Sequence, residues 1–167
     1  YKWFPHNKGG KFRNWYGNNE LVVNFEKGGE NIKKYGDFHN RSYDLNAKDV
    51  YFKEGITWTA LTSSKNSFRY SPHGFLFDSN KGPMIFNNEN KVLKYLLSFF
   101  NSKVTHYIKD IFNPTLSLQN GDINNFPIII SKSYKTKVEI LCLNNINMSQ
   151  SDWDSFETSW DFKRHPF

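Results

Sequence analysis

A long apolar stripe between residues 93 and 111 constrains this chain more than any other feature. Its spacing of three and four places the stripe on one face of a helix for about five turns. The stripe consists of Leu93, Leu96, Leu97, Phe100, Val104, Tyr107, Ile108 and Ile111. We expect one core helix over residues 90–112, with Asn88 or Asn90 as its N-cap and Pro114 forbidding its continuation. Asn101-Ser102 would allow a division into two helices, although the stripe keeps its phase there.

Shorter patterns fill in the rest of the fold. Apolar, β-branched and aromatic runs predict strands at 20–25, 56–61, 67–70, 74–78, 84–86 and 126–128. Residues 1–19 read as loop with short extended pieces, and 26–35 as a weak helix with Ile32 and Tyr35 facing inward. A second helix is expected over 135–148, with 149–152 as a cap before Trp153. The fold class we predict is α+β, with one mixed, strongly bent sheet of short strands and helices in the C-terminal half.

Composition limits the class of protein. The 167 residues include 16 Phe, 9 Tyr and 5 Trp, which is enough apolar surface for one domain with a core. The single cysteine, Cys142, excludes an intramolecular disulfide and a cysteine-based zinc cluster, and its apolar surroundings predict a buried thiol. We expect a cytoplasmic bacterial protein without a membrane span, because lysines interrupt the best apolar run.

The charge balance allows a polyanionic partner without requiring one. The net charge is +6, and residues 1–35 hold seven basic and three acidic side chains. Such a balance suits a phosphate backbone. It also follows from AT-rich codons, which favour Lys, Asn, Phe, Tyr and Ile.

The N-terminal stretch concentrates this signal. Lys8, Lys11 and Arg13 alternate with Phe12, Trp15 and Tyr16 around three glycines. Basic residues interleaved with aromatics can hold phosphates and stack on bases or sugars. The alternative is a glycine turn whose aromatics are tucked into the core.

Catalytic signatures are missing from the sequence. No glycine-rich strand-to-helix turn of the S-adenosylmethionine-binding kind is present, and Asn113-Pro114 is followed by Thr-Leu rather than by the Pro-Tyr or Pro-Phe that grips a flipped adenine. The five His have no paired spacing for a metal. Asp37, Asp44 and Asp49 could imitate a nuclease cluster, but no Lys-flanked pattern accompanies them. We expect this segment to be non-catalytic.

Four blocks of the chain resemble adenine-specific DNA methyltransferases, most closely BREX-type phage-exclusion and type IIG restriction-methylation enzymes. The blocks are Pro5–Phe25, Tyr51–Trp58 with Arg69-Tyr70, Tyr95–Ile128 with its Asn113-Pro114-Thr115 and Gly121-Asp122-Ile123, and Asp152–Phe162. His6, Phe25 and Thr59 depart mildly from the family pattern, whereas the last block agrees letter for letter. The resemblance covers nearly the whole chain, which we read as a piece of a larger protein.

The resemblance implies the C-terminal target-recognition domain of such an enzyme. Residues 1–130 would form this domain, and 131–167 a helical extension packed on it as a single unit. The partners implied are double-stranded DNA and an N-terminal methyltransferase domain of the same parent chain. This segment would need no cofactor, while the parent would bind S-adenosylmethionine and methylate adenine N6. The helix at 90–112 would support the sheet and abut that catalytic part.

Candidate DNA-binding residues follow from the loops and the basic side chains. Phosphate contacts are expected from Lys8, Lys11, Arg13 and Arg69, and base contacts from loops near Tyr16–Asn18, His39–Tyr43 and Ser71–His73. The full set is Lys8, Lys11, Arg13, Trp15, Tyr16, Asn18, His39, Arg41, Arg69, Tyr70 and His73. The alternatives are a protein-interaction module of a phage-defence complex, which would use the aromatic N-terminal loop and the 153–162 tail, and a metal-dependent nuclease.

Overall fold

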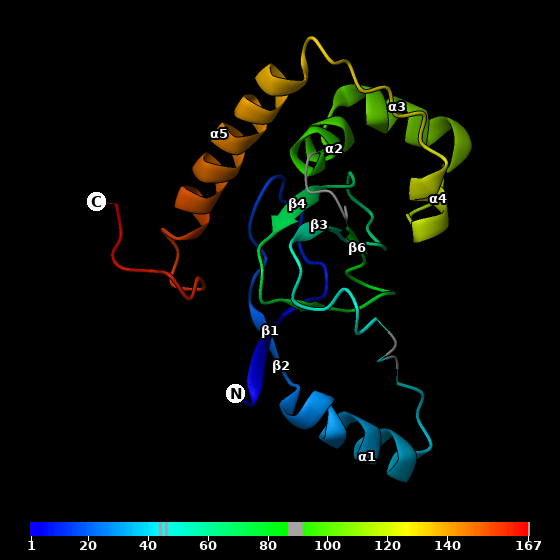
Figure 1. Ribbon diagram of the computed structural model, residues 1–167, viewed down its shortest axis with the longest axis vertical. Coiled ribbons are helices and arrows are strands. Elements are labelled where there is room, and N and C mark those ends of the chain that lie inside the picture. The colour runs from blue at the N-terminus through cyan, green and yellow to red at the C-terminus, as the bar shows by residue number, and fades with distance from the viewer. Residues whose placement is uncertain (44, 46, 87–91, 167) are drawn as a thin grey trace.

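Figure 1 shows the computed structural model as an elongated molecule, with α1 at one end and α3 at the other. The structure describes residues 1–43, 45, 47–86 and 92–166. The predicted N-caps Asn88 and Asn90 lie outside these residues. The elements are β1 Trp3–Asn7, β2 Leu21–Asn24, the 3-10 turn η1 Glu26–Gly28, α1 Glu30–His39, β3 Gly55–Trp58, β4 Phe68–Ser71, β5 Leu76–Phe77, β6 Met84–Ile85, α2 Leu93–Phe100, α3 Lys103–Phe112, α4 Asn120–Asn124 and α5 Lys135–Trp153.

The strands form two small sheets. In the first, β1 lies between β2, which is antiparallel to it, and β5, which is parallel. In the second, β3 lies between β4 and β6, both antiparallel to it. The α+β class is confirmed, but the strands pair as two three-stranded sheets instead of one bent sheet. Gly9 and Gly10 have positive φ and turn the chain out of the first sheet directly after β1.

The core lies between the second sheet and α2. All four residues of β3 are buried, as expected for a central strand covered on both faces. The Phe68 ring of β4 stacks on Phe100 of α2 with ring centroids 4.9 Å apart. The Trp58 indole is fully buried and donates its N–H to the Leu118 carbonyl at 2.8 Å. Cys142 of α5 is buried in the same cluster, which confirms its predicted place.

The helix predicted for 90–112 is divided into α2 and α3 at Asn101-Ser102, which is the division that the sequence allowed as an alternative. The Asn101 side chain accepts the Phe68 N–H at 3.0 Å and donates to the Phe68 carbonyl at 2.9 Å, so this residue brackets the backbone of β4. Ser102 then caps α3 by accepting the Thr105 N–H at 3.3 Å. The apolar stripe divides accordingly. Leu93, Leu97 and Phe100 are buried, whereas Tyr107 and Ile111 are exposed.

The segment after Pro114 differs from the prediction. Residues 120–124 form the short helix α4 instead of a Gly-Asp turn, because the Asp122 carboxylate caps it by accepting the Gln119 N–H at 2.7 Å. Residues 126–130 form no strand; Phe126 is buried in the core, while Ile129 is exposed.

Three further boundaries move. Residues 3–7 form β1, in a stretch expected as loop with short extended pieces. Helix α1 begins only after Gly29, whose φ of 80° ends the preceding turn, and its Tyr35 is 54% exposed instead of facing inward. Helix α5 runs through 149–152 to Trp153, so the predicted cap is the helix's last turn. Across the described residues, every helix is too short or too polar to cross a lipid bilayer.

The Asn101 bracket yields a stability prediction. Asn101→Ala removes two hydrogen bonds and strips the Phe68 N–H of its partner, so the free energy of unfolding should fall by about 1–3 kcal/mol. Urea denaturation measures this loss. The control is Asn144→Ala on the exposed side of α5, which should change the value by less than about 0.5 kcal/mol. Equal midpoints for both variants would contradict the bracket.

Candidate nucleic-acid interface

The candidate interface is built on the glycine loop, residues 8–19, which connects β1 to β2. Its backbone has positive φ at Gly9, Gly10, Trp15, Gly17 and Asn18. Hydrogen bonds to Thr59, the residue after β3, hold the start of the loop: Gly10 donates its N–H to Thr59 Oγ1, and that hydroxyl donates to the Gly10 carbonyl, each at 3.0 Å. The loop is therefore fixed in shape without regular secondary structure.

The middle of the glycine loop pairs with the edge of the second sheet. Trp15 donates its N–H to the Phe68 carbonyl at 2.9 Å and accepts the Tyr70 N–H at 2.8 Å, which forms a parallel bridge opposite Arg69. This pairing covers the free edge of β4. It also brings together six of the predicted site residues, namely Arg13, Trp15, Tyr16, Asn18, Arg69 and Tyr70.

Arg13 fastens the glycine loop to α5 instead of facing solvent. Its guanidinium donates to the Tyr16 carbonyl at 3.0 Å, forms an ion pair with Asp152 and lies 5.1 Å from the centre of the Trp153 ring. Ser149 of α5 adds bonds from its hydroxyl to the Asn14 and Tyr16 carbonyls. The predicted phosphate contact of Arg13 competes with this arrangement, because Nε and Nη2 already donate within the protein and the guanidinium lies against the Trp153 ring.

The structure also buries Arg69, for which the sequence predicted a phosphate contact. Its side chain is 1% exposed, because the glycine loop and the core cover this position of β4. Burial lowers the pKa of the guanidinium to about 10, so it stays protonated at neutral pH. Among the described residues, its side chain makes one hydrogen bond, from Nη1 to Ser67 Oγ at 3.4 Å, and Nε has no partner. A side chain so enclosed cannot reach a phosphate.

The aromatic members of the set serve the fold. Tyr16 is 7% exposed, and burial together with Asp154 raises the pKa of its hydroxyl. Tyr70 donates its hydroxyl to the Glu54 carboxylate, and burial followed by this bond raises its pKa. Asn18 donates from its amide to the Lys11 carbonyl at 2.9 Å and so closes the glycine loop. The expectation of aromatics tucked into the core describes Tyr16 well, whereas Phe12 is 52% exposed.

Three exposed lysines remain available around the glycine loop. Lys8 and Lys11 lie on the loop itself, and Lys81 lies beside it in the turn between β5 and β6. The two segments touch: a Cβ added at Gly82 would come within 2.7 Å of Lys8 Cα. The sequence prediction missed Lys81. Its signal was Gly82, because a glycine in a turn marks a site where another backbone approaches closely.

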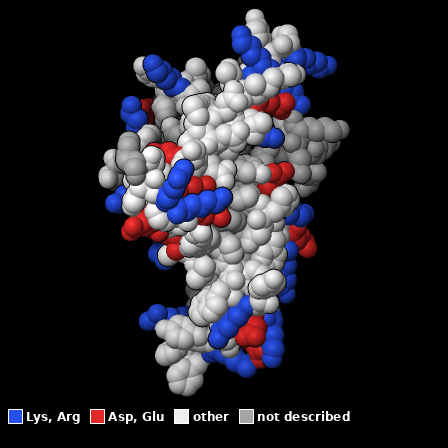
Figure 2. Space-filling model, turned by 90° about the vertical axis from the view of Figure 1, so that its left-hand side faces the viewer, with Lys and Arg blue, Asp and Glu red and all other residues white. Residues whose placement is uncertain are grey.

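The remaining candidates lie elsewhere. His39 and Arg41 are exposed at the end of α1 farthest from the sheets (Figure 1), together with Tyr35 and Phe38. His73 is exposed in the turn between β4 and β5. Figure 2 shows the face that carries α5 and the C-terminal tail, where basic and acidic atoms are mixed from the middle to the lower end. The structure therefore separates the predicted site residues into three places: the glycine loop with β4, the end of α1, and the turn between β4 and β5.

Within the part of the chain that the structure describes, no three His, Cys, Asp or Glu side chains are grouped to hold a metal ion. Asp37 accepts a hydrogen bond from the Tyr43 hydroxyl at 3.2 Å, and Asp44 lies outside the described residues.

Two curated proteins match almost the whole chain. Adenine-specific methyltransferase BrxX of Escherichia coli strain HS is 39% identical over 166 residues, 98% of this chain. Adenine-specific methyltransferase PglX of Lacticaseibacillus casei strain Zhang is 42% identical over 165 residues, 96% of this chain. The chain is similar to one segment of adenine-specific methyltransferases.

That segment spans 13% of the length of BrxX and of PglX. No family model matches the chain. The predicted relationship to adenine-specific methyltransferases is confirmed, while the recognition role stays a prediction.

The packing of Gly17 tests the fixed shape of the glycine loop. A Cβ at Gly17, where φ is 115°, would lie 2.5 Å from Arg13 Nε and 2.9 Å from Trp153 Cε3. Gly74 has a similar φ of 96° but open space around it. Gly74→Ala should therefore cost only the backbone strain of about 1–2 kcal/mol. Gly17→Ala should cost about 1–3 kcal/mol more, because Arg13 and Trp153 must shift.

Urea denaturation of both variants measures the difference, and near-UV circular dichroism reports the Trp153 environment. Equal losses in the two variants would mean that the glycine loop is not packed against α5.

Proposed function

We propose that this chain is the part of a BREX-type adenine-specific methyltransferase that recognises the target sequence in double-stranded DNA. The observation that carries the proposal is the fixed glycine loop with exposed Lys8, Lys11 and neighbouring Lys81, in a chain similar to a segment of BrxX and PglX. The chain carries a net charge of +6 and no recognisable methyl-transfer motif. Its contribution to such an enzyme is therefore binding.

Phosphate contacts are assigned to the three lysines. Contacts to phosphate oxygens set the register of a protein on the duplex without reading sequence. The glycine loop suits this task because its hydrogen bonds to the second sheet and its ion pair to α5 exist before DNA arrives. Less chain entropy is then lost on binding than with a flexible basic loop. Arg13 and Arg69 hold the loop and the edge of the sheet from within.

Base contacts are assigned to the end of α1. A projecting helix end is an element that fits the major groove, and Arg reads guanine by donating to its O6 and N7. Arg41 and His39 are exposed there, beside the exposed ring of Phe38. His73 is a further exposed candidate for a base or phosphate contact.

The remainder of the parent enzyme supplies the chemistry in this proposal. A methyltransferase domain of the same chain would bind S-adenosylmethionine and transfer the methyl group to adenine N6 in the bacterial cytoplasm. The outer face of α3 is the surface assigned to that contact. Val104, Tyr107 and Ile111 form a stripe there and are 58%, 73% and 82% exposed. This stripe is the part of the predicted apolar stripe that stays exposed after the break at Asn101.

The phosphate assignment predicts a salt dependence. The logarithm of the binding constant for duplex DNA should fall linearly with the logarithm of salt concentration, and each of Lys8→Ala, Lys11→Ala and Lys81→Ala should reduce the slope by about 1. Lys137→Ala removes the same charge from the exposed part of α5 distant from the glycine loop and should leave the slope unchanged. Fluorescence anisotropy with a random duplex measures it. If Lys137→Ala and Lys8→Ala reduce the slope equally, DNA binds to the basic surface in general and not to the glycine loop.

The base assignment predicts a change of specificity. Selection from a random duplex pool, followed by sequencing, should enrich one short motif that contains adenine. Arg41→Ala should relax one position of that motif by about 1–3 kcal/mol while keeping the salt slope. The matched control is Lys34→Ala, which removes a cation from α1 that is paired with Glu30 and leaves the motif unchanged. An unchanged motif in Arg41→Ala would move base reading elsewhere.

A protein-interaction module is the second candidate, and the α3 stripe favours it. Exposed apolar surface at helical spacing is typical of protein contacts. A complex formed through this stripe should respond little to salt, in contrast to DNA binding through lysines. Salt-insensitive capture of a partner, lost in Tyr107→Asp and retained without Lys8, would favour this candidate.

A further inference from the structure

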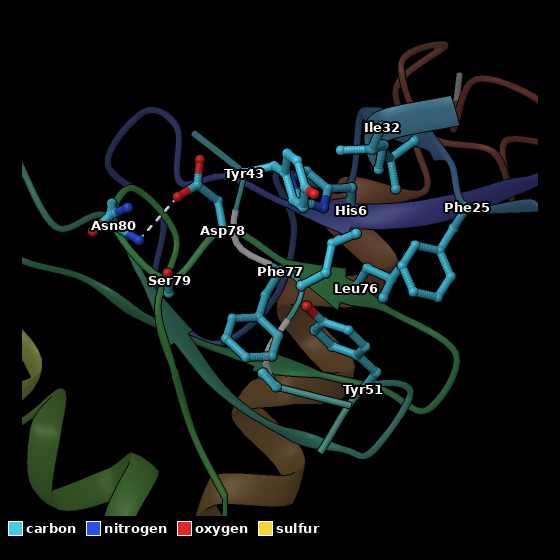
Figure 3. A pocket seen from close by; sticks show the side chains of 13 residues that line it. His6, Phe25, Ile32, Tyr43, Tyr51, Leu76, Phe77, Asp78, Ser79 and Asn80 are labelled. Atoms are coloured by element: carbon cyan, nitrogen blue, oxygen red, sulfur yellow. Dashed lines mark hydrogen bonds between the residues drawn. The ribbon is translucent and has the colours of Figure 1, made fainter. Parts of the chain in front are cut away.

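A cavity separate from the α3 stripe lies between the first sheet and α1. Its volume is about 270 Å³, just below the range of about 300–1,000 Å³ that is typical of small-molecule sites. Figure 3 shows Asp78 and Asn80 at one end, Phe25 and Ile32 at the other, and Tyr51, Leu76 and Phe77 along the wall between them. The cavity therefore draws its lining from β1, β2, β5 and α1, which the fold holds together.

The walls are aromatic and apolar. Phe25 and Tyr51 contact each other edge to face at 5.5 Å, and Tyr51 also meets the Phe77 ring at 5.8 Å. These contacts hold the rings in place. Aromatic rings fixed in this way form stacking surfaces for planar heterocycles, because every nucleobase has a π-face.

The polar groups of the cavity point to a ligand with hydrogen-bonding edges. His6 Nδ1 is buried and has no hydrogen-bond partner within the described residues. Burial lowers the pKa of His6, so its imidazole is neutral at neutral pH and offers one donor and one acceptor nitrogen. Asp78 uses Oδ1 to accept the Asn80 and Lys81 N–H groups at 2.9 and 3.1 Å, which shapes the turn at the rim.

Positive charge lies beside this rim. Lys8 follows His6 by two residues and is close enough to depress its pKa. Lys81 directly follows the lining residue Asn80, and its turn touches the backbone of Lys8 at Gly82. Both lysine side chains are exposed. The aromatic walls, the unpartnered nitrogen of His6 and the two neighbouring lysines match the three parts of a nucleotide, which are the π-face, the base edge and the phosphate.

We propose that this cavity binds one unstacked nucleotide, with its base between the aromatic walls and its phosphate held by Lys8 and Lys81. An unpaired nucleotide of DNA and a free mononucleotide offer the same chemistry to the cavity. If the bound nucleotide belongs to DNA, the inference rests on the proposed function. Binding of the free mononucleotide stands independently of it.

The test uses two neighbouring valines of β2. Val23 lines the cavity, whereas Val22 points to the other face of the strand and is 52% exposed. Val23→Phe fills the cavity, and Val22→Phe adds the same bulk outside it. The probes are the four deoxynucleoside monophosphates, deoxyribose 5-phosphate as a probe without a base, and paired duplexes with or without one bulged nucleotide. Isothermal calorimetry and fluorescence anisotropy measure the affinities.

The original chain and Val22→Phe should bind a mononucleotide at least about tenfold more tightly than deoxyribose 5-phosphate, because stacking adds affinity only where a base is present. Val23→Phe should lose that difference. Phe77→Leu, which keeps the apolar wall but removes one ring, should weaken base binding several-fold and covers the case in which Val23→Phe fails to fold. If the original chain and Val22→Phe bind the bulged duplex more tightly than the paired duplex, and Val23→Phe does not, the nucleotide comes from DNA. Mononucleotide binding without that preference identifies the free nucleotide.

Equal affinities in Val22→Phe and Val23→Phe, or no gain from a base with any probe, would overturn the inference. Salt-dependent binding of the paired duplex would survive that result, because Lys8, Lys11 and Lys81 are unchanged in both variants. Failure of the proposed function would look different, with no duplex binding by any chain while mononucleotides still bind.

Discussion

The backbone of Phe68 is the point on which the rest of this structure depends. Its N–H donates a hydrogen bond to the Asn101 side chain, and its carbonyl accepts hydrogen bonds from the Asn101 amide and from the Trp15 N–H. Its ring lies between Trp58 and Phe100. One residue of β4 thus joins the glycine loop, the second sheet and the junction of α2 with α3. Buried backbone groups must be satisfied, and here a loop and a helix end do so in place of a neighbouring strand.

This junction explains why the two ends of the chain meet. With Trp15 fixed on β4, Arg13 faces the last turns of α5, where Asp152 and Trp153 receive it. The N-terminal and C-terminal motifs that resemble the methyltransferases are thus two sides of one contact. Charge placed in that contact stabilises the loop, which leaves Lys8 and Lys11 to face outward from a fixed support.

The sequence predicted helices and strands well where apolar residues repeat on one face of a segment. The α+β class, most of the strands and the buried Cys142 follow from local patterns. The sequence allowed a division at Asn101-Ser102 without requiring it, because the cause of the division is a long-range bond to β4 while the apolar stripe keeps its phase. Arg69 shows the same limit. From sequence, an arginine near a strand end is expected to be exposed, but the glycine loop covers Arg69. The sequence does not place Lys81 beside the loop, because only the structure shows that Gly82 contacts the backbone of Lys8.

Lys8 and Lys81 neighbour residues that line the aromatic cavity, and the two proposals give the lysines and the cavity different roles. Attraction between Lys8, Lys81 and phosphates is long-ranged, weakened by salt and indifferent to base identity. Contact with Phe77 and Tyr51 is short-ranged and requires a base that has left its stack, which costs a few kcal/mol in paired DNA. A nucleotide already unpaired avoids that cost. In these proposals the cavity would distinguish an unstacked base from a stacked one, and the lysines would attract nucleic acid to it.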